Sequence, residues 1–210
     1  MPFDFKKAYR ALYQPKAWPE LVTVPAANYV AVRGQGDPNE PGGAYQTAIS
    51  VLYAVAYTLK MSRRAGYHME GYFDYVVPPL EGFWQQGNGA DKSAFRWISA
   101  LRLPDFVAAE DVEWAREAAG SRKGIDCSAA IFWTVEEGLC VQSLHVGPFD
   151  TEPATLSAME ALLCSEGYAW DMGKSRLHHE IYLTDPRRTP PEKWRTVLRC
   201  PIRQAAGTAE

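Results

Sequence analysis

One strand-like segment, His178 to Thr184, carries side chains that could perform acid–base chemistry. Side chains alternate along a strand, so Glu180 and Tyr182 share one face while the apolar residues between them share the other. A carboxylate among apolar or aromatic neighbours has its charged form disfavoured and can then exchange a proton near neutral pH. Glu180 and Tyr182 are therefore the candidate catalytic residues, although alternation alone also fits a solvent-facing glutamate.

Aromatic residues indicate what such a carboxylate would face. Two tyrosines one turn apart on a helix-like segment could support a flat ligand, and a tryptophan in a Pro- and Gly-rich connection needs a reason to be there. A loop glutamate three residues before that tryptophan could face the same groove. Any one of these aromatics could equally be a core residue. The candidate substrate-binding residues are Tyr53, Tyr57, Glu81, Trp84, Trp133 and Phe149.

Several familiar chemistries find no support in the sequence. His178 and His179 are adjacent on a strand, so they face opposite ways and cannot bind one metal ion together. The cysteines are scattered without a Cys-x-x-Cys pair, there is no Gly-x-Ser-x-Gly motif, and Gly34-Gln35-Gly36 lacks the further glycine of a dinucleotide fingerprint. We therefore expect no metal and no cofactor.

An internal repeat indicates which elements position these residues. The pattern Trp-x-x-x-Leu-Arg-x-Pro occurs twice, beginning at Trp97 and at Trp194, and Gly66-Tyr67 matches Gly167-Tyr168 upstream. Two similar units that pack about a pseudo-twofold axis create a groove where they meet, and such interfaces favour small-molecule sites. The repeat therefore predicts a duplicated fold with a ligand groove between its halves.

Hydrophobic periodicity and turn residues predict an α+β fold with two pseudo-twofold βαββ repeats, an antiparallel sheet and a central ligand cleft. We expect one domain over 1–210, with repeat one at about 20–105, a linking helix within about 106–128 and repeat two at about 129–204. The expected helices are 3–13, 44–61, 110–119 and 153–165. The expected strands are 21–32 (one or two), 72–77, 95–103, 129–135 and 139–146 (a hairpin), 178–184 and 196–202, with a loop at 78–89 and a frayed tail after 203.

Composition sets the class of protein. The chain has 210 residues, 47% of them hydrophobic, which is enough to bury a substantial core. A formal net charge of -3 argues against nucleic-acid binding. No stretch resembles a signal peptide or a membrane span, so we expect a cytoplasmic location. We expect the protein to be a monomer or a homodimer.

The residues that carry this chemistry also carry a family resemblance. The segment His178 to Arg188, followed by Pro191, Glu192, Lys193 and Leu198-Arg199, looks like the C-terminal signature of GyrI-like small-molecule-binding proteins. Segments 34–39, 52–57, 79–84, 136–142 and 145–150 are similar to the stand-alone branch of that family. The resemblance covers almost the whole chain. It implies two βαββ repeats around a ligand cleft, without an attached helix-turn-helix segment.

The resemblance implies three functions. Some stand-alone members hydrolyse the cyclopropane ring of DNA-alkylating cyclopropanoid compounds. In that case Glu180 would orient or deprotonate the attacking water, and Tyr182 would stabilise the developing phenolate. The candidate aromatic residues would stack on the substrate. Other members bind planar hydrophobic or cationic drugs without turnover, and founding members protect DNA gyrase. We expect a small planar hydrophobic ligand and neither nucleic-acid nor membrane partners.

Overall fold

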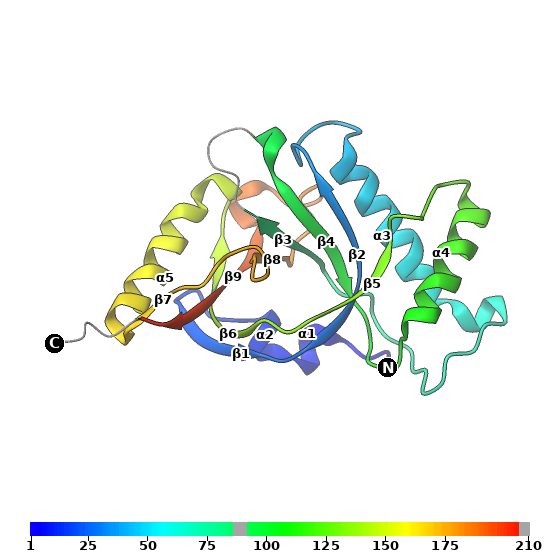
Figure 1. Ribbon diagram of the computed structural model, residues 1–210, viewed down its shortest axis with the longest axis horizontal. Coiled ribbons are helices and arrows are strands. Elements are labelled where there is room, and N and C mark those ends of the chain that lie inside the picture. Colours follow the sequence, from blue (N-terminus) through cyan, green and yellow to red (C-terminus); the bar gives the residue numbers. More distant parts are fainter. Residues whose placement is uncertain (86–91, 206–210) are drawn as a thin grey trace.

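The computed structural model describes residues 1–85 and 92–205 and shows helices packed on a single curved sheet (Figure 1). The helices are α1 Phe5–Ala8, α2 Arg10–Tyr13, α3 Ala44–Lys60, α4 Ala109–Lys123 and α5 Glu152–Glu166. The strands are β1 Glu20–Val24, β2 Ala27–Gln35, β3 Leu80–Gln85, β4 Arg96–Arg102, β5 Ile131–Val135, β6 Gly138–Val146, β7 Tyr168–Trp170, β8 His178–Tyr182 and β9 Arg195–Gln204. In these two ranges no helix is long and apolar enough to cross a membrane.

The strand order divides the antiparallel sheet into two matching halves. The order is β1-β6-β9-β8-β3-β4-β2-β5, with β7 added to β9. Each half repeats the sequence strand, helix, strand, strand, as β2-α3-β3-β4 and as β6-α5-β8-β9. The halves join where β3 pairs with β8, between α5 on one side and α3 on the other (Figure 1). The predicted α+β class with two βαββ units is confirmed.

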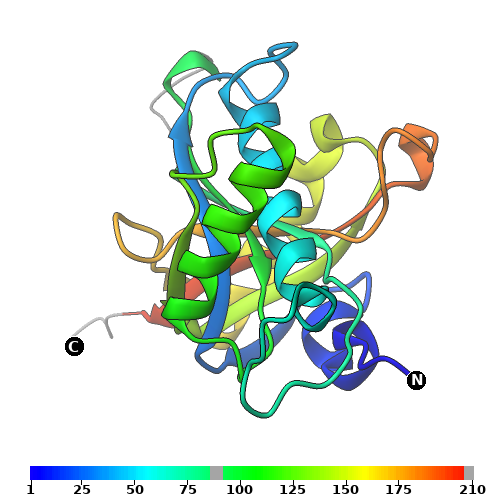
Figure 2. The ribbon, with the colours of Figure 1, turned by 90° about the vertical axis from the view of Figure 1, so that its right-hand side faces the viewer.

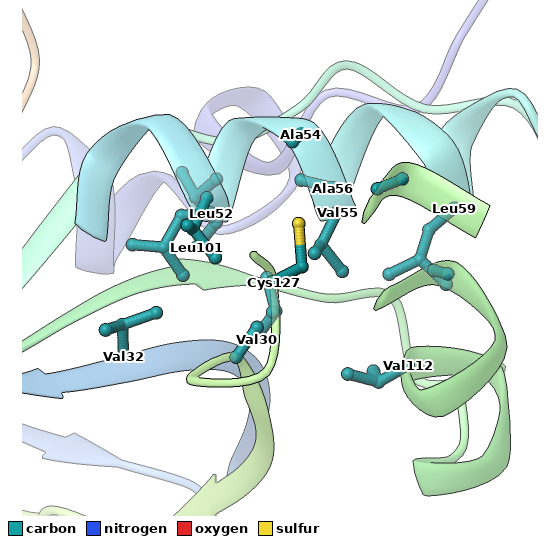
Figure 3. Close-up of a cluster of buried hydrophobic side chains, with 14 of the residues drawn as sticks. Val30, Val32, Leu52, Ala54, Val55, Ala56, Leu59, Leu101, Val112 and Cys127 are labelled. Atoms are coloured by element: carbon teal, nitrogen blue, oxygen red, sulfur yellow. The ribbon is translucent and has the colours of Figure 1, made fainter. Parts of the chain in front are cut away.

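Helix α3 forms where the sequence predicts it because its apolar residues recur at helical spacing. Val51, Leu52, Val55 and Leu59 are buried, and each such side chain contributes on the order of 1.5–3 kcal/mol when removed from water. They pack against residues of β2 and β4 that include Leu101 (Figure 3). Helix α4 lies beside α3 and completes this core (Figure 2).

The two long helices of the repeats cover the same face of the sheet. Met159 and Leu163 of α5 pack on Val141 and Leu198, which occupy the same face as the residues under α3. The opposite face is covered near the middle by the N-terminal helices α1 and α2, which form a further cluster with Ile181. At its centre the sheet therefore has one face that lies between α3 and α5, which we call the helical face. The N-terminal helices α1 and α2 cover the opposite face there.

The strand predicted at 72–77 is wrong. Within it Tyr75 forms an isolated bridge with Phe3, and the central strand of the first half is β3, inside the predicted loop 78–89. In the sequence pattern Pro78 and Pro79 indicate a break after a strand, whereas in the structure they precede one, a position where proline costs no ladder hydrogen bond. Residues 86–89 of the predicted loop and the tail after 205 lie outside the described residues.

The hairpin predicted from 129–135 and 139–146 is also wrong. Strand β5 pairs with β2, while β6 pairs with β1 and β9, so the two neighbours in sequence lie at distant places in the sheet. The turn at Glu136 and Glu137 satisfied the local pattern of a hairpin. The predicted helix 3–13 is likewise divided, into α1 and α2.

A buried ionic network joins the two halves at β3 and β8. His179 lies 2.9 Å from Glu81 through Nε2 and 3.0 Å from Glu137 through Nδ1, and Arg199 donates to Glu137 at 3.1 Å. Two carboxylate acceptors require both ring nitrogens to donate, so the ring is an imidazolium. Burial opposes this charge, but Glu137 and Glu81 outweigh it and raise the pKa of His179.

The network also fixes the N-terminal segment. Tyr13 donates to Glu81 at 2.7 Å, and Arg199 donates to the carbonyl oxygen of Leu12 at 2.7 Å. Burial alone would raise the pKa of Glu137, but His179 and Arg199 lower it to about 2. The network places two glutamates against His179 and Arg199, and buried ionic groups are tolerated when they have such partners.

Replacing Glu137 by Gln should destabilise the protein by about 3–5 kcal/mol, because His179 and Arg199 then remain buried with too little negative charge. Equilibrium urea unfolding measures the change. The matched control is Glu136→Gln, since Glu136 is the exposed neighbour in sequence and should change stability by less than about 0.5 kcal/mol. Equal effects of the two substitutions would show that the network does not hold the halves.

The lowered pKa of Glu137 predicts how the free energy of unfolding changes at acid pH. A carboxyl whose folded pKa is lowered stabilises the protein fully above its unfolded value of 4.5 and loses that contribution as the pH falls toward about 2. The free energy of unfolding should therefore decrease over this interval. In Glu137→Gln the slope over the same interval should be shallower, and an unchanged slope would contradict the assignment. Urea titrations at a series of pH values measure both.

Candidate functional site

The helical face of β3 and β8 brings Glu180 and Tyr182 together with Trp84. Gly82 lies directly opposite Glu180 in the register, and the Trp84 indole Nε1 donates to the Tyr182 hydroxyl at 3.0 Å. A Cβ atom on Gly82 would lie 2.7 Å from that indole nitrogen and 2.8 Å from that hydroxyl oxygen. Glycine is therefore required at position 82 for the two rings to meet across the strands.

Tyr45, in the first turn of α3, packs on this cluster from the helix side. Its ring stacks on Trp84 with centroids 5.6 Å apart, and Tyr45 is close enough to Tyr182 for the two phenols to influence each other's ionisation. Burial raises the pKa of Tyr45 to about 12. Burial and the nearby charge of Glu180 raise the pKa of Tyr182 well above its usual value. Both hydroxyls stay protonated at neutral pH and can donate hydrogen bonds. The sequence did not single out Tyr45.

Glu180 is a mostly buried carboxylate with a histidine as its neighbour. Its side chain is 13% exposed, and one oxygen lies 3.2 Å from Nε2 of His178 on the same strand face. The other ring nitrogen of His178 lies 3.0 Å from Sγ of Cys200. Burial disfavours a charged ring, but the contacts with Cys200 and Glu180 outweigh it and raise the pKa of His178. An imidazolium at this place compensates the charge of Glu180.

A second carboxyl, Glu152 at the start of α5, faces Glu180. Its Oε1 atom is buried and has no hydrogen-bond partner among the residues that the structure describes. Burial, and then the charge of Glu180, raise the pKa of Glu152 to about 8, so Glu152 is protonated at neutral pH. Sequence reasoning missed Glu152, because an acid in the first turn of a helix is expected there for the helix dipole alone.

Further aromatic residues extend the cluster on both sides. Phe149, just before α5, meets Tyr182 edge to face with centroids 5.9 Å apart. On α3, Tyr53 stacks with Tyr57 at 6.3 Å and is close enough to Tyr45 to influence its ionisation. Tyr57 is 48% exposed. The helical-face cluster, as we call it from here, consists of Tyr45, Tyr53, Tyr57, Trp84, Phe149, Glu152, His178, Glu180 and Tyr182.

Two candidate residues do not lie on this face. Glu81 pairs with Ile181 in the register, so it points to the opposite face, where it joins His179 in the ionic network. Trp133 of β5 also lies on that face, against Phe83 at 4.9 Å, beside a hollow of about 20 Å³ that is too small for a ligand. The expectation that Glu81 faces the same groove as Glu180 is wrong, because Glu81 belongs to a strand and follows its alternation. Trp84 likewise lies in β3 rather than in a loop.

The geometry therefore supplies one set of groups for proton transfer and for binding flat molecules. It combines a carboxylate, a protonated carboxyl and two phenol donors with several ring faces, in surroundings that are largely shielded from water. Within residues 1–85 and 92–205, no group of three or more His, Cys, Asp or Glu side chains is arranged to hold a metal ion.

Comparisons with known proteins agree with this fold and place it in a family. Residues 18–203 match the model of the GyrI-like small molecule binding domain. A structure described as a hydrolase from Listeria innocua is 46% identical, covers 96% of this chain and 100% of its own, and has a TM-score of 0.89. An uncharacterized conserved protein from the same organism is 47% identical over 96% and 100%, with a TM-score of 0.90.

More distant structures share the fold alone. The C-terminal domain of EcmrR is 12% identical, covers 89% of this chain and 98% of its own, and has a TM-score of 0.57. No curated protein sequence matches the chain. Because the family model spans both halves of the sheet and the linking helix, the chain belongs to the GyrI-like small molecule binding domain family.

Proposed function

We propose that this protein binds flat, largely apolar small molecules at the helical-face cluster and opens the cyclopropane ring of DNA-alkylating cyclopropanoid compounds by adding water. The observation that carries the proposal is the pair Glu180 and Glu152 beside the Tyr182 hydroxyl, in which burial and the charge of Glu180 raise the pKa of Glu152 to about 8. A carboxyl whose surroundings raise its pKa in this way can serve as an acid beside a second carboxyl that serves as a base. The hydrolase description of one Listeria innocua relative supports the reaction class.

In the proposed reaction, the water oxygen forms a bond to the methylene carbon of the cyclopropane. The carbon–carbon bond to the ring junction breaks, and its electron pair moves into the conjugated dienone and ends on the oxygen as a phenolate. Glu180 takes the proton that the water loses. Tyr182, held by the Trp84 indole, donates a hydrogen bond to the developing phenolate, and Glu152 supplies the proton that completes the phenol.

The aromatic side chains would hold the substrate. Tyr45, Trp84 and Phe149 lie around Tyr182, and Tyr53 and Tyr57 continue the ring surface along α3. Aromatic faces bind planar molecules through offset stacking, with about 0.5–1.5 kcal/mol per pair beyond the area buried. The substrate is thereby oriented with its dienone oxygen toward Tyr182.

A second function is favoured by the same pair of carboxyls. A planar cation that entered the cluster would displace the proton of Glu152 and pair with two carboxylates, which describes a protein that sequesters cationic drugs without turnover. The two functions differ in whether a ring-opened product forms.

Replacing Glu180 by Gln should lower turnover of a cyclopropanoid alkylator by about 10²–10⁴-fold while binding persists, because the amide keeps the shape but accepts no proton. Mass spectrometry of the ring-opened product, with fluorescence titration of binding, separates the two effects. Glu192→Gln, at an exposed glutamate after β8, is the matched control and should retain full activity. Tight binding without product in the wild type would favour sequestration instead, and full activity of Glu180→Gln would remove Glu180 as the base.

The raised pKa of Glu152 predicts that kcat/KM decreases at alkaline pH. A carboxyl with a pKa of about 8 donates its proton below that pH, so kcat/KM should fall as the pH rises through about 8. Glu152→Gln cannot ionise, so this variant should be slower and should lack that fall. A pH profile of product formation between pH 6 and 10 measures both. An alkaline limb that persists unchanged in Glu152→Gln would assign it to another group.

A further inference from the structure

A cavity of about 450 Å³ lies on the face of the sheet opposite the helical-face cluster. Drug-sized ligands occupy pockets of about 300–1,000 Å³, so the volume suits a small molecule. Neither Glu180 nor any other member of the helical-face cluster lines it. The lining residues are Arg33, Gly34, Gln35, Phe83, Gln85, Arg96, Trp97, Ile98, Lys174 and Leu177.

The floor of the cavity is built from two rows of side chains across β2, β4 and β3. In the inner row Ile98 pairs with Arg33 on one side and with Phe83 on the other. In the outer row Arg96 pairs with Gln35 and with Gln85. Paired residues of an antiparallel sheet point to the same face. The inner row therefore has the apolar side chains of Ile98 and Phe83 beside Arg33, and the outer row is polar and cationic.

The wall comes from the segment 171–177, which contributes Lys174 and Leu177 and is anchored to the fold. Arg176 donates to the carbonyl oxygens of Glu137 at 2.6 Å and of Leu139 at 2.9 Å, and it also pairs with Asp171. Leu177 packs in the cluster that contains Phe83. The wall is therefore held in place by the same turn that supplies Glu137 to the ionic network.

The charge of the cavity is opposite to that of the chain. Among the residues that the structure describes, Arg33, Arg96 and Lys174 give the lining three positive charges and no acid, whereas the protein has a formal net charge of -3. None of the three forms an ion pair with a residue in the described part of the chain, although the Arg33 guanidinium lies 5.9 Å from the ring centre of Trp133. Three cations without an ion-pair partner among the described residues, beside the apolar side chains of Phe83 and Ile98, favour a ligand with an anionic group at one end.

We propose that this cavity is a second small-molecule site, which takes an organic anion with a flat apolar ring system, such as an aromatic carboxylate or sulfonate. The ring lies on Phe83, Ile98 and Leu177, and the anionic group is bound by Arg33, Arg96 and Lys174. The site uses different residues from the cluster around Glu180, and the two sites take ligands of different charge.

The test uses 1-anilinonaphthalene-8-sulfonate as the probe and the full chain as the protein. Its fluorescence titration should give saturable binding that weakens about tenfold or more in the double variant Arg33→Gln/Arg96→Gln, because two charge-assisted contacts are lost. Gln35→Glu should also weaken binding, since it places an acid in the cavity without removing any cation. The neutral analogue N-phenyl-1-naphthylamine should bind wild type and variants alike.

Two controls assign the probe to this cavity. Arg195→Gln removes an exposed arginine of β9 outside the cavity, and Glu180→Gln alters the helical-face cluster; both should leave the affinity for the sulfonate unchanged. Wild-type affinity in the double variant and in Gln35→Glu would overturn the proposal. So would a loss of sulfonate binding in Glu180→Gln that the cavity variants do not share, because the probe would then occupy the helical-face cluster.

Discussion

The buried contact of His179 with Glu81 and Glu137 is the interaction on which the rest of the structure depends. It lies where β3 meets β8, and it joins residues from both halves of the sheet. Arg199 balances the charge, and the N-terminal helices are bound to the same network through Tyr13. Because an unpaired charge at this place would be costly, the network specifies one register for the two central strands.

Because side chains alternate along a strand, the register that His179 fixes also determines which residues lie on the opposite face of the sheet. Once His179 is fixed, its neighbours His178 and Glu180 must point to the helical face, opposite Trp84 and Gly82. The duplicated halves differ there, since Leu80 lies opposite Leu101 as Glu180 lies opposite Leu198. One half thus contributes a carboxylate where the other contributes an apolar side chain, so the cluster has a single chemical centre.

Neighbours decide what each buried glutamate does. Burial by itself raises the pKa of both Glu137 and Glu152. Glu137 adjoins His179 and Arg199, which lower its pKa to about 2 and make it a permanent structural anion. Glu152 faces Glu180, which raises its pKa further, to about 8, so that its proton can be exchanged near neutral pH. The same side chain therefore serves stability at one place and is available for chemistry at the other.

The sequence by itself determined the long helices and most strands, the internal repeat and the sharing of one strand face by Glu180 and Tyr182, because periodicity reports which neighbours point the same way. It misplaced the central strand of the first half at 72–77, joined β5 and β6 in a hairpin, and assigned Glu81 to the wrong face. Only the tertiary structure decided that β3 pairs with β8, and that Tyr45 and Glu152 reach the same cluster from separate helices. These contacts join segments about 30 to 140 residues apart, and no local pattern encodes which distant partners the packing of two halves brings together.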